Sequence, residues 1–258
     1  MAFRIDVRDR VAELVIDNPP VNALASAQWR ELAERMTELG RRADVQCVVI
    51  RAEGRGFQAG VDIKELAADP SRITEVNRGC YDAFAAIYDC PVPVIAAVHG
   101  YCLGGGIGIA GSSDIVLASE DATFGLPEID RGALGAATHL MRLFGMQKTR
   151  RMLYTGESID AREAWRLGGV ESVVPRETLR DAALELARAI AGKSPRALRL
   201  AKQSLNGIEL LDVKTSYRFE QGFTLELYTS RDSREARDAF VEKRGAKFED
   251  DDGKDDGG

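Results

Sequence analysis

A cluster of closely spaced glycines and one glutamate are the residues of this chain whose types and spacing could do chemistry. Gly104, Gly105, Gly106 and Gly108 follow an apolar run, 94–98, which predicts a buried strand leading into a short helix. Each glycine weakens a helix by about 1 kcal/mol relative to alanine, so this cluster indicates that a ligand approaches free backbone N–H groups. N–H groups at a helix N-terminus stabilise developing negative charge, which makes this stretch half of an oxyanion hole.

Glu128, which lies further along the chain than this glycine helix, is the candidate catalytic carboxylate. It comes directly after Pro127, and Phe124 and Leu126 make the approach to it apolar. Apolar surroundings raise the pKa of a carboxylate by desolvation, which suits a general acid or base. The alternatives are a solvated loop residue and a salt-bridge partner.

The same glycines admit two other interpretations. Residues 106–111 match the dinucleotide pattern GxGxxG, but five residues separate Val98 from Gly104, and the next predicted strand, 114–118, starts three residues after Gly111. A crossover helix does not fit in that space, which argues against a nucleotide-binding unit. The glycines could also serve only to let two helices pack closely.

A second glycine-rich loop, 54–64, leaves the end of the buried strand predicted at 45–51. Ligands of open α/β sheets collect at the carboxyl ends of the strands, so this loop and the one at Gly104 should face the same crevice. Each loop could then donate one N–H group to the same ligand atom.

The composition favours a cytoplasmic globular protein. The chain has 258 residues, 45% of them hydrophobic, and a net charge of −6 without a concentrated basic face, which argues against nucleic-acid binding. No signal peptide or membrane-spanning run is present in the sequence. The cysteines lack CxxC spacing and only two histidines accompany them, so we expect no metal site and four buried thiols, Cys47, Cys80, Cys90 and Cys102.

The remaining patterns predict a layered α/β core. An opening hairpin (3–7 and 11–16), a helix (24–40) and the strand at 45–51 form a parallel crossover unit. Further helices are predicted at 71–90, 147–153, 160–167, 178–191, 195–205 and 211–229, with a short strand at 170–174. A basic cluster on the predicted helix 195–205 and before it should be a solvated face: Arg188, Lys193, Arg196, Arg199 and Lys202.

Three long motifs resemble the crotonase superfamily, the enoyl-CoA hydratase/isomerase fold: IAAVHGYCLGGGIGIAGSSDIVLASEDATFGLPEI, RGFQAGVDIKE and AFVEKRGAKF. The resemblance implies a spiral of ββα turns followed by a C-terminal helical region. We therefore expect a catalytic core at 1–195, a helical region for trimerisation and site cover at 196–248, and an acidic disordered tail at 249–258. It also implies a homotrimer or a dimer of trimers.

The resemblance implies an acyl-CoA thioester as substrate, with coenzyme A as part of that substrate and no tightly bound cofactor. The thioester oxygen would accept hydrogen bonds from the backbone N–H groups of Val61 and Gly105. The residues implied in CoA binding are Ala59, Asp62, Ile63 and Lys64, together with Lys243, Lys247 and Phe248, which in some relatives come from a neighbouring subunit.

One departure from the family pattern narrows the chemistry. Hydratases of this superfamily use two glutamates, and at the first position this chain has Gly108, so only Glu128 remains. The resemblance therefore favours members with one carboxylate, which share a thioester enolate intermediate. Asp130 could share the work of Glu128, or it could pair with Arg131. His139 is expected to be structural, and His99 is assigned no role.

Four further motifs look most like the actinobacterial crotonases that open the last steroid rings of cholesterol as CoA thioesters: PEIDRGALGAATHL, GRGFQAGVDIKE, NRGCYDAF and YRFEQGFTLEL. This implies hydrolysis of a carbon–carbon bond in a bicyclic keto-acyl-CoA. Two alternatives stay open: an enoyl-CoA hydratase or isomerase, and a non-catalytic acyl-CoA binding or scaffold protein.

Overall fold

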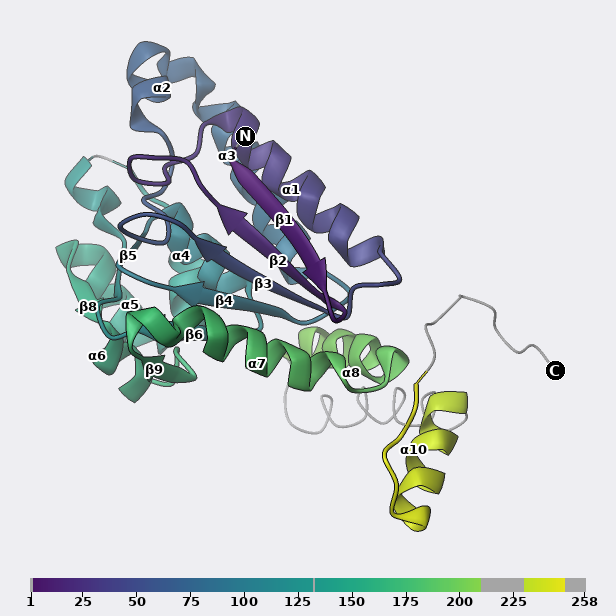
Figure 1. Ribbon diagram of the computed structural model, residues 1–258. Helices are drawn as coiled ribbons and strands as arrows, with labels where there is room; N and C mark the ends of the chain where they lie inside the picture. Colours follow the sequence, from purple (N-terminus) through teal and green to yellow (C-terminus); the bar gives the residue numbers. More distant parts are fainter. Residues whose placement is uncertain (1, 132, 210–229, 249–258) are drawn as a thin grey trace.

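Two sheets form the core of the protein, and the larger one is mainly parallel (Figure 1). The computed structural model describes the chain except residues 1, 132, 210–229 and 249–258. The larger sheet has the order β1-β2-β3-β4-β6-β9 and is parallel apart from the β1–β2 hairpin, and the smaller has the order β5-β7-β8. The strands are β1 (Phe3–Arg8), β2 (Val11–Ile16), β3 (Cys47–Ala52), β4 (Val94–Val98), β5 (Tyr101–Leu103), β6 (Ile115–Ser119), β7 (Thr123–Gly125), β8 (Ser158–Asp160) and β9 (Ser172–Val174).

The chain passes directly from the larger sheet into the smaller one. Strand β5 follows β4 after two residues, and β7 follows β6 after three. Because β4 pairs with β6 and β5 pairs with β7, both connections turn at the same edge. The carboxyl ends of β4 and β6 therefore lie between the two sheets, where the chain bends around the glycines.

Helices cover both faces of β2, β3, β4 and β6, and these strands are accordingly buried and mostly apolar. Along β3, Val48 and Ile50 belong to the cluster that includes α1 (Ser26–Arg41), whereas Cys47 and Val49 pack against α7 (Leu179–Ala191). Strand side chains alternate between the two faces, so one short strand serves both layers. The helices are α1 (Ser26–Arg41), α2 (Ile63–Ala68), α3 (Ile73–Tyr88), α4 (Gly105–Ser112), α5 (Ala137–Thr155), α6 (Ala161–Arg166), α7 (Leu179–Ala191), α8 (Pro195–Ile208) and α10 (Arg231–Glu242). In the described part of the chain, no helix is both long and apolar enough to cross a bilayer.

The α/β prediction is confirmed, including the hairpin, the strand at 94–98 and the parallel β2–α1–β3 crossover. The sequence patterns missed α2, β5, β7 and β8, which are three to six residues long and too short to show a period. The predicted helix 211–229 and the tail 249–258 lie outside the described residues. The proposed domain boundaries stay predictions.

The expectation of a fully solvated basic cluster was wrong for Lys202. This side chain is only 5% exposed, and its Nζ donates to Asp114 Oδ2 at 2.7 Å and to the Val92 carbonyl at 3.2 Å. Asp114 precedes β6 and also accepts the N–H of Val94 at 2.7 Å. Because a buried ammonium needs such partners, Lys202 fixes α8 against the amino ends of β4 and β6.

Glu13 joins the larger sheet to α7 through an ion pair with Arg180, and we expect it to make the free energy of unfolding depend on pH. It is 6% exposed in β2, where Arg180 donates to both of its oxygens at 2.7 Å and Arg51 donates to Oε1. Hydrogen bonds from Arg180, reinforced by Arg51, lower the pKa of Glu13 from 4.5 to about 2. A depressed folded-state pKa stabilises the protein above the unfolded value, and that stability is lost as pH falls from about 4.5 toward 2.

We therefore expect Glu13→Gln to lower the free energy of unfolding by about 2–3 kcal/mol at pH 7, because two arginines lose their charged partner. Urea denaturation of both proteins at pH 7 and pH 3 measures this. The difference in the free energy of unfolding between wild type and variant should be smaller at pH 3 than at pH 7. An equal gap at the two pH values would contradict the proposed linkage.

Candidate active site

The loop after β3 is held in place by a fully buried glutamine. Gln58 donates from Nε2 to the Gly60 carbonyl at 2.6 Å and accepts the Gly60 N–H at 2.7 Å. Its backbone carbonyl accepts the N–H of Leu103 at 2.9 Å, which fixes the loop to β5. The two glycine-rich loops therefore meet, as the strand-end argument predicts.

The backbone N–H of Val61 faces away from α1. Leu24 donates its N–H to the Gly60 carbonyl at 3.1 Å and accepts the N–H of Asp62 at 2.9 Å. These two bonds flank Val61 in a parallel bridge, so its own N–H points to the opposite side. The start of α4 lies close to this loop, because a Cβ built on Gly60 would be 3.5 Å from the Gly105 nitrogen.

Glu128 lies directly against the backbone at the start of α4. Gly104, the residue before this helix, has φ 56° and ψ −113°, a conformation that essentially only glycine adopts. A Cβ built on Gly104 would overlap with Oε1 of Glu128, and Oε2 of Glu128 is buried. The short 3-10 helix η2 (Pro127–Arg131) carries Glu128 to this position. The structure thus brings the predicted carboxylate and the glycine helix together.

Asp130 is placed elsewhere. It is exposed, and its Oδ2 would lie 2.5 Å from a Cβ built on Gly156, the residue that ends α5. Asp130 and Glu128 are two residues apart in the same helix η2, yet they contact different glycines. Of the two candidate carboxylates, Glu128 is the one beside Gly104.

Phe84 occupies the space next to Gly108, where any side chain would have to sit. A Cβ built on Gly108 would overlap with the ring of Phe84, which comes from α3. The Phe84 ring packs edge-on against Trp29 with centroids 5.5 Å apart and against His139 with centroids 4.8 Å apart. The sequence reasoning missed the positions of Phe84 and Trp29. The motif NRGCYDAF contains Phe84, but nothing in it shows which helix the ring would face.

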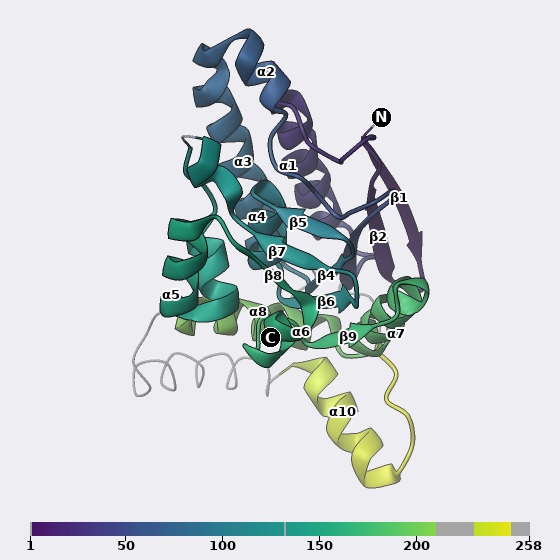
Figure 2. The same cartoon turned by 90° about the vertical axis from the view of Figure 1, so that its left-hand side faces the viewer.

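The residues expected to bind CoA fall into two separate groups. Asp62 begins α2 by accepting the N–H of Lys64 at 3.0 Å, and the exposed Ile63 and Lys64 follow the half-buried Ala59 along one surface segment. By contrast, Lys243, Lys247 and Phe248 follow α10. Both views place α10 and α2 at opposite ends of the molecule (Figures 1 and 2). One chain therefore does not bring these two groups together.

His99 supports the turn between β4 and β5. Its Nε2 lies 3.1 Å from the Gly54 carbonyl, at the start of the glycine-rich loop 54–64. Burial lowers the pKa of His99, so the ring is neutral near pH 7 and can donate one hydrogen bond there. This gives His99 a positioning role that the sequence did not indicate.

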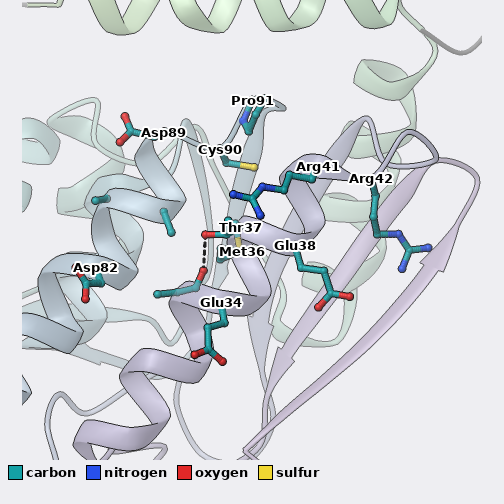
Figure 3. A pocket seen from close by; sticks show the side chains of 13 residues that line it. Glu34, Met36, Thr37, Glu38, Arg41, Arg42, Asp82, Asp89, Cys90 and Pro91 are labelled. Atoms are coloured by element: carbon teal, nitrogen blue, oxygen red, sulfur yellow. Dashed lines mark hydrogen bonds between the residues drawn. The ribbon is translucent and has the colours of Figure 1, made fainter. Parts of the chain in front are cut away.

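A cavity of about 920 Å³ lies between the carboxyl-terminal ends of α1 and α3 (Figure 3). It is lined by the last turns of both helices and by Cys90 and Pro91, and Glu34, Glu38, Arg41 and Arg42 are among its charged neighbours. The ends of α1 and α3 lead into the amino ends of β3 and β4. This cavity is therefore remote from Glu128 and from the strand ends where ligands of such sheets bind.

Residues 6–251 match the family model described as enoyl-CoA hydratase/isomerase. A curated relative from Rhodococcus jostii RHA1, the "(7aS)-7a-methyl-1,5-dioxo-2,3,5,6,7,7a-hexahydro-1H-indene-carboxyl-CoA hydrolase", is 52% identical over 236 residues, which is 91% of this chain and 92% of the relative. The protein of the same name from Mycobacterium tuberculosis H37Rv is 52% identical over 90% of this chain and 95% of its own length.

More distant proteins share the fold. The short-chain-enoyl-CoA hydratase of Clostridium acetobutylicum is 34% identical over 93% of this chain and 94% of its own length. The crystal structure of an enoyl-CoA hydratase from Mycobacterium smegmatis superposes with a TM-score of 0.91 at 30% identity, covering 96% of this chain and 98% of that one. An enoyl-CoA hydratase from Bacillus anthracis gives a TM-score of 0.92 at 30% identity, covering 96% and 99%.

Proposed function

The chain belongs to the enoyl-CoA hydratase/isomerase family, the crotonase superfamily, and from this premise we propose that it hydrolyses a ring carbon–carbon bond in a bicyclic keto-acyl-CoA of steroid degradation. Its 52%-identical relatives are named as hydrolases of such a compound, a methyl-substituted hexahydroindene dione joined to CoA. The single observation that carries the proposal is that Glu128 lies against Gly104 whereas Phe84 fills the space beside Gly108. Glu128 is therefore the carboxylate at the start of the glycine helix, and an aromatic ring occupies the space beside Gly108.

The proposed reaction passes through an enolate. Water adds to a ring ketone, the adjacent ring carbon–carbon bond breaks, and its electron pair moves onto the thioester carbonyl. The N–H groups of Val61 and Gly105 stabilise the resulting oxyanion, and each such donor contributes roughly 3–4 kcal/mol to transition-state stabilisation in related sites. The former ketone carbon becomes a carboxylate, and the enolate carbon takes up a proton.

We assign the proton transfer to Glu128. Its buried oxygen and its contact with Gly104 place it beside the first turn of α4, which contains Gly105. It activates the water or protonates the enolate carbon. Asp130 is the alternative candidate for proton transfer, and it is less well placed because it lies against Gly156.

Coenzyme A enters this site as part of the substrate. In our proposal, the segment from Ala59 to Lys64 runs along the CoA nucleotide. Lys243, Lys247 and Phe248 contribute from a neighbouring copy, because their own chain holds them at the end opposite α2. This arrangement requires an oligomer, and we propose a homotrimer or a dimer of trimers in the cytoplasm. Light scattering tests the oligomeric state. A monomer in solution would remove the second group from the CoA site.

The substrate is tested by mass spectrometry with a bicyclic keto-acyl-CoA and linear enoyl-CoAs. Ring opening adds the mass of one water, and so does hydration, so the product must also gain a carboxylate that forms a methyl ester while CoA is retained. Hydrolysis of the thioester would instead release CoA. A product with added water and no new carboxylate would overturn the proposal in favour of a hydratase.

Crotonyl-CoA hydration should be feeble, and Gly108→Glu alone should not increase it. The new side chain would collide with the ring of Phe84, which Trp29 and His139 hold from both sides. We expect the rate to remain at least about 10²-fold below that of a two-glutamate hydratase, since one acid–base group contributes about 10²–10⁴-fold.

Ultraviolet absorbance at the enoyl thioester band measures crotonyl-CoA hydration, and thermal denaturation checks that the variant is folded. The double variant Gly108→Glu/Phe84→Ala is the comparison, because it makes room for the carboxylate. A wild-type rate equal to that of a dedicated hydratase would reject the one-carboxylate site.

A further inference from the structure

The indole N–H of Trp29 is a buried donor without a use in the fold. Trp29 is 0% exposed, and its Nε1 finds no hydrogen-bond partner among the described residues. Buried polar atoms are paired in the great majority of cases, and a tryptophan N–H usually finds a partner when buried. Burying the indole N–H without a partner costs free energy of desolvation. A phenylalanine at the same apolar position would not have this cost.

The six-membered ring of Trp29 faces the start of α4 with the atoms next to this N–H. A Cβ built on Gly105 would lie 2.6 Å from both Cζ2 and Cη2 of Trp29. Nε1 and Cζ2 are bonded to the same ring carbon, Cε2, so the N–H leaves the ring beside the atom that contacts Gly105. The unused donor is therefore next to the proposed oxyanion hole and not at a distant point of the core.

The surroundings of Trp29 suit a fused hydrocarbon ring. Phe84 lies edge-on between Trp29 and His139 and covers Gly108, one turn beyond Gly104. Burial lowers the pKa of His139, so its ring is uncharged near pH 7. The result is an aromatic wall along α4, defined by Trp29, Phe84 and His139, that begins beside Glu128. Sites for small molecules combine such apolar walls with a few placed polar groups.

A bicyclic diketone bound against this aromatic wall would have a ketone oxygen in apolar surroundings. Water attacks one ring ketone, and the other stays intact as a hydrogen-bond acceptor that costs free energy to bury without a donor. The indole N–H can only donate, so it matches a ketone oxygen. We infer that Trp29 is a specificity-determining residue whose Nε1–H donates a hydrogen bond to a ring ketone of the acyl group. This inference rests on the proposed function, which supplies the ketone.

The test uses nuclear magnetic resonance of the full chain labelled with ¹⁵N-tryptophan, in a Glu128→Gln background that slows turnover. The chain has two tryptophans, and Trp165 is exposed in α6, so it serves as an internal control. Three ligands are compared: the bicyclic diketone thioester and the two analogues that each lack one ring oxygen. The indole ¹H signal of Trp29 should move downfield with the diketone and with one analogue, and the Trp165 signal should stay in place.

Calorimetry on Trp29→Phe in the same background gives a second measurement. The affinity for the diketone should fall by about 10-fold, which is typical of losing one buried hydrogen bond, and the affinity for the analogue lacking the recognised oxygen should not change. If this variant does not fold, the ¹⁵N-tryptophan spectra of the protein that retains Trp29 still show whether its N–H binds the ketone.

The outcomes separate this inference from the proposed function. If none of the thioesters binds, the proposed function fails. If the diketone binds and the Trp29 signal stays in place, or moves equally with both analogues, the diketone remains the substrate and Trp29 is not its donor. Equal losses of affinity for all three ligands in Trp29→Phe would likewise reduce Trp29 to a packing role.

Discussion

Glu128→Gln should lower turnover of the bicyclic keto-acyl-CoA by about 10²–10⁴-fold, the range expected for removing a general acid or base. Glutamine keeps the volume of the side chain, so the contact with Gly104 is retained while proton transfer is lost. Binding should change little, because the proposed oxyanion donors at Val61 and Gly105 are backbone groups that the substitution does not touch. Single-turnover kinetics measures the chemical step, and calorimetry with the intact thioester measures binding.

Asp130→Asn is the matched comparison, because Asp130 is exposed on the same short helix and contacts Gly156 instead. Its effect should be much smaller than that of Glu128→Gln. If Asp130→Asn abolished turnover and Glu128→Gln did not, Asp130 would be the catalyst. If neither variant changed the rate, neither carboxylate would be the general acid or base. Binding of the thioester without turnover by the wild type would support a non-catalytic acyl-CoA binding role.

The parts of the site that could be predicted from the sequence are those set by local backbone chemistry. The four glycines after a buried strand predicted a helix start with free N–H groups, and α4 begins at Gly105. The position of loop 54–64 followed from the rule that ligands gather at the carboxyl ends of parallel strands, and Gln58 holds that loop against β5. In both cases neighbouring residues carry the whole signal.

The parts that could not be predicted depend on contacts between distant segments. Phe84, Trp29 and Gly108 come from α3, α1 and α4, and only the packing of these helices reveals that an aromatic ring covers Gly108. Lys202 has the helical spacing of a surface residue, yet Asp114, 88 residues earlier, makes its burial possible. Periodicity reports which face of a helix is apolar, but not which polar residue finds a partner.

Gly104→Ala should be nearly as damaging as the loss of Glu128, although it removes no functional group. The φ of 56° and ψ of −113° at Gly104 strain any other residue, at a cost of about 1–3 kcal/mol in stability. The added Cβ would also overlap with Oε1 of Glu128 and displace the carboxylate. A shift of about 1 Å in a catalytic group can lower the rate by about 10²-fold, and we expect a decrease of at least that size.

Gly168→Ala is the control that separates strain from displacement. Gly168 also has a positive φ, 82°, but a Cβ built there meets nothing within 4 Å. It should lose about 1–2 kcal/mol of stability and keep its turnover. Urea denaturation and kcat/KM are measured on both variants, with the rate of each taken on the folded fraction. If Gly104→Ala is destabilised and its folded fraction still turns over normally, the contact with Gly104 does not hold Glu128 in its catalytic position. If its rate falls while that of Gly168→Ala does not, the conformation of this one glycine sets the place of the carboxylate.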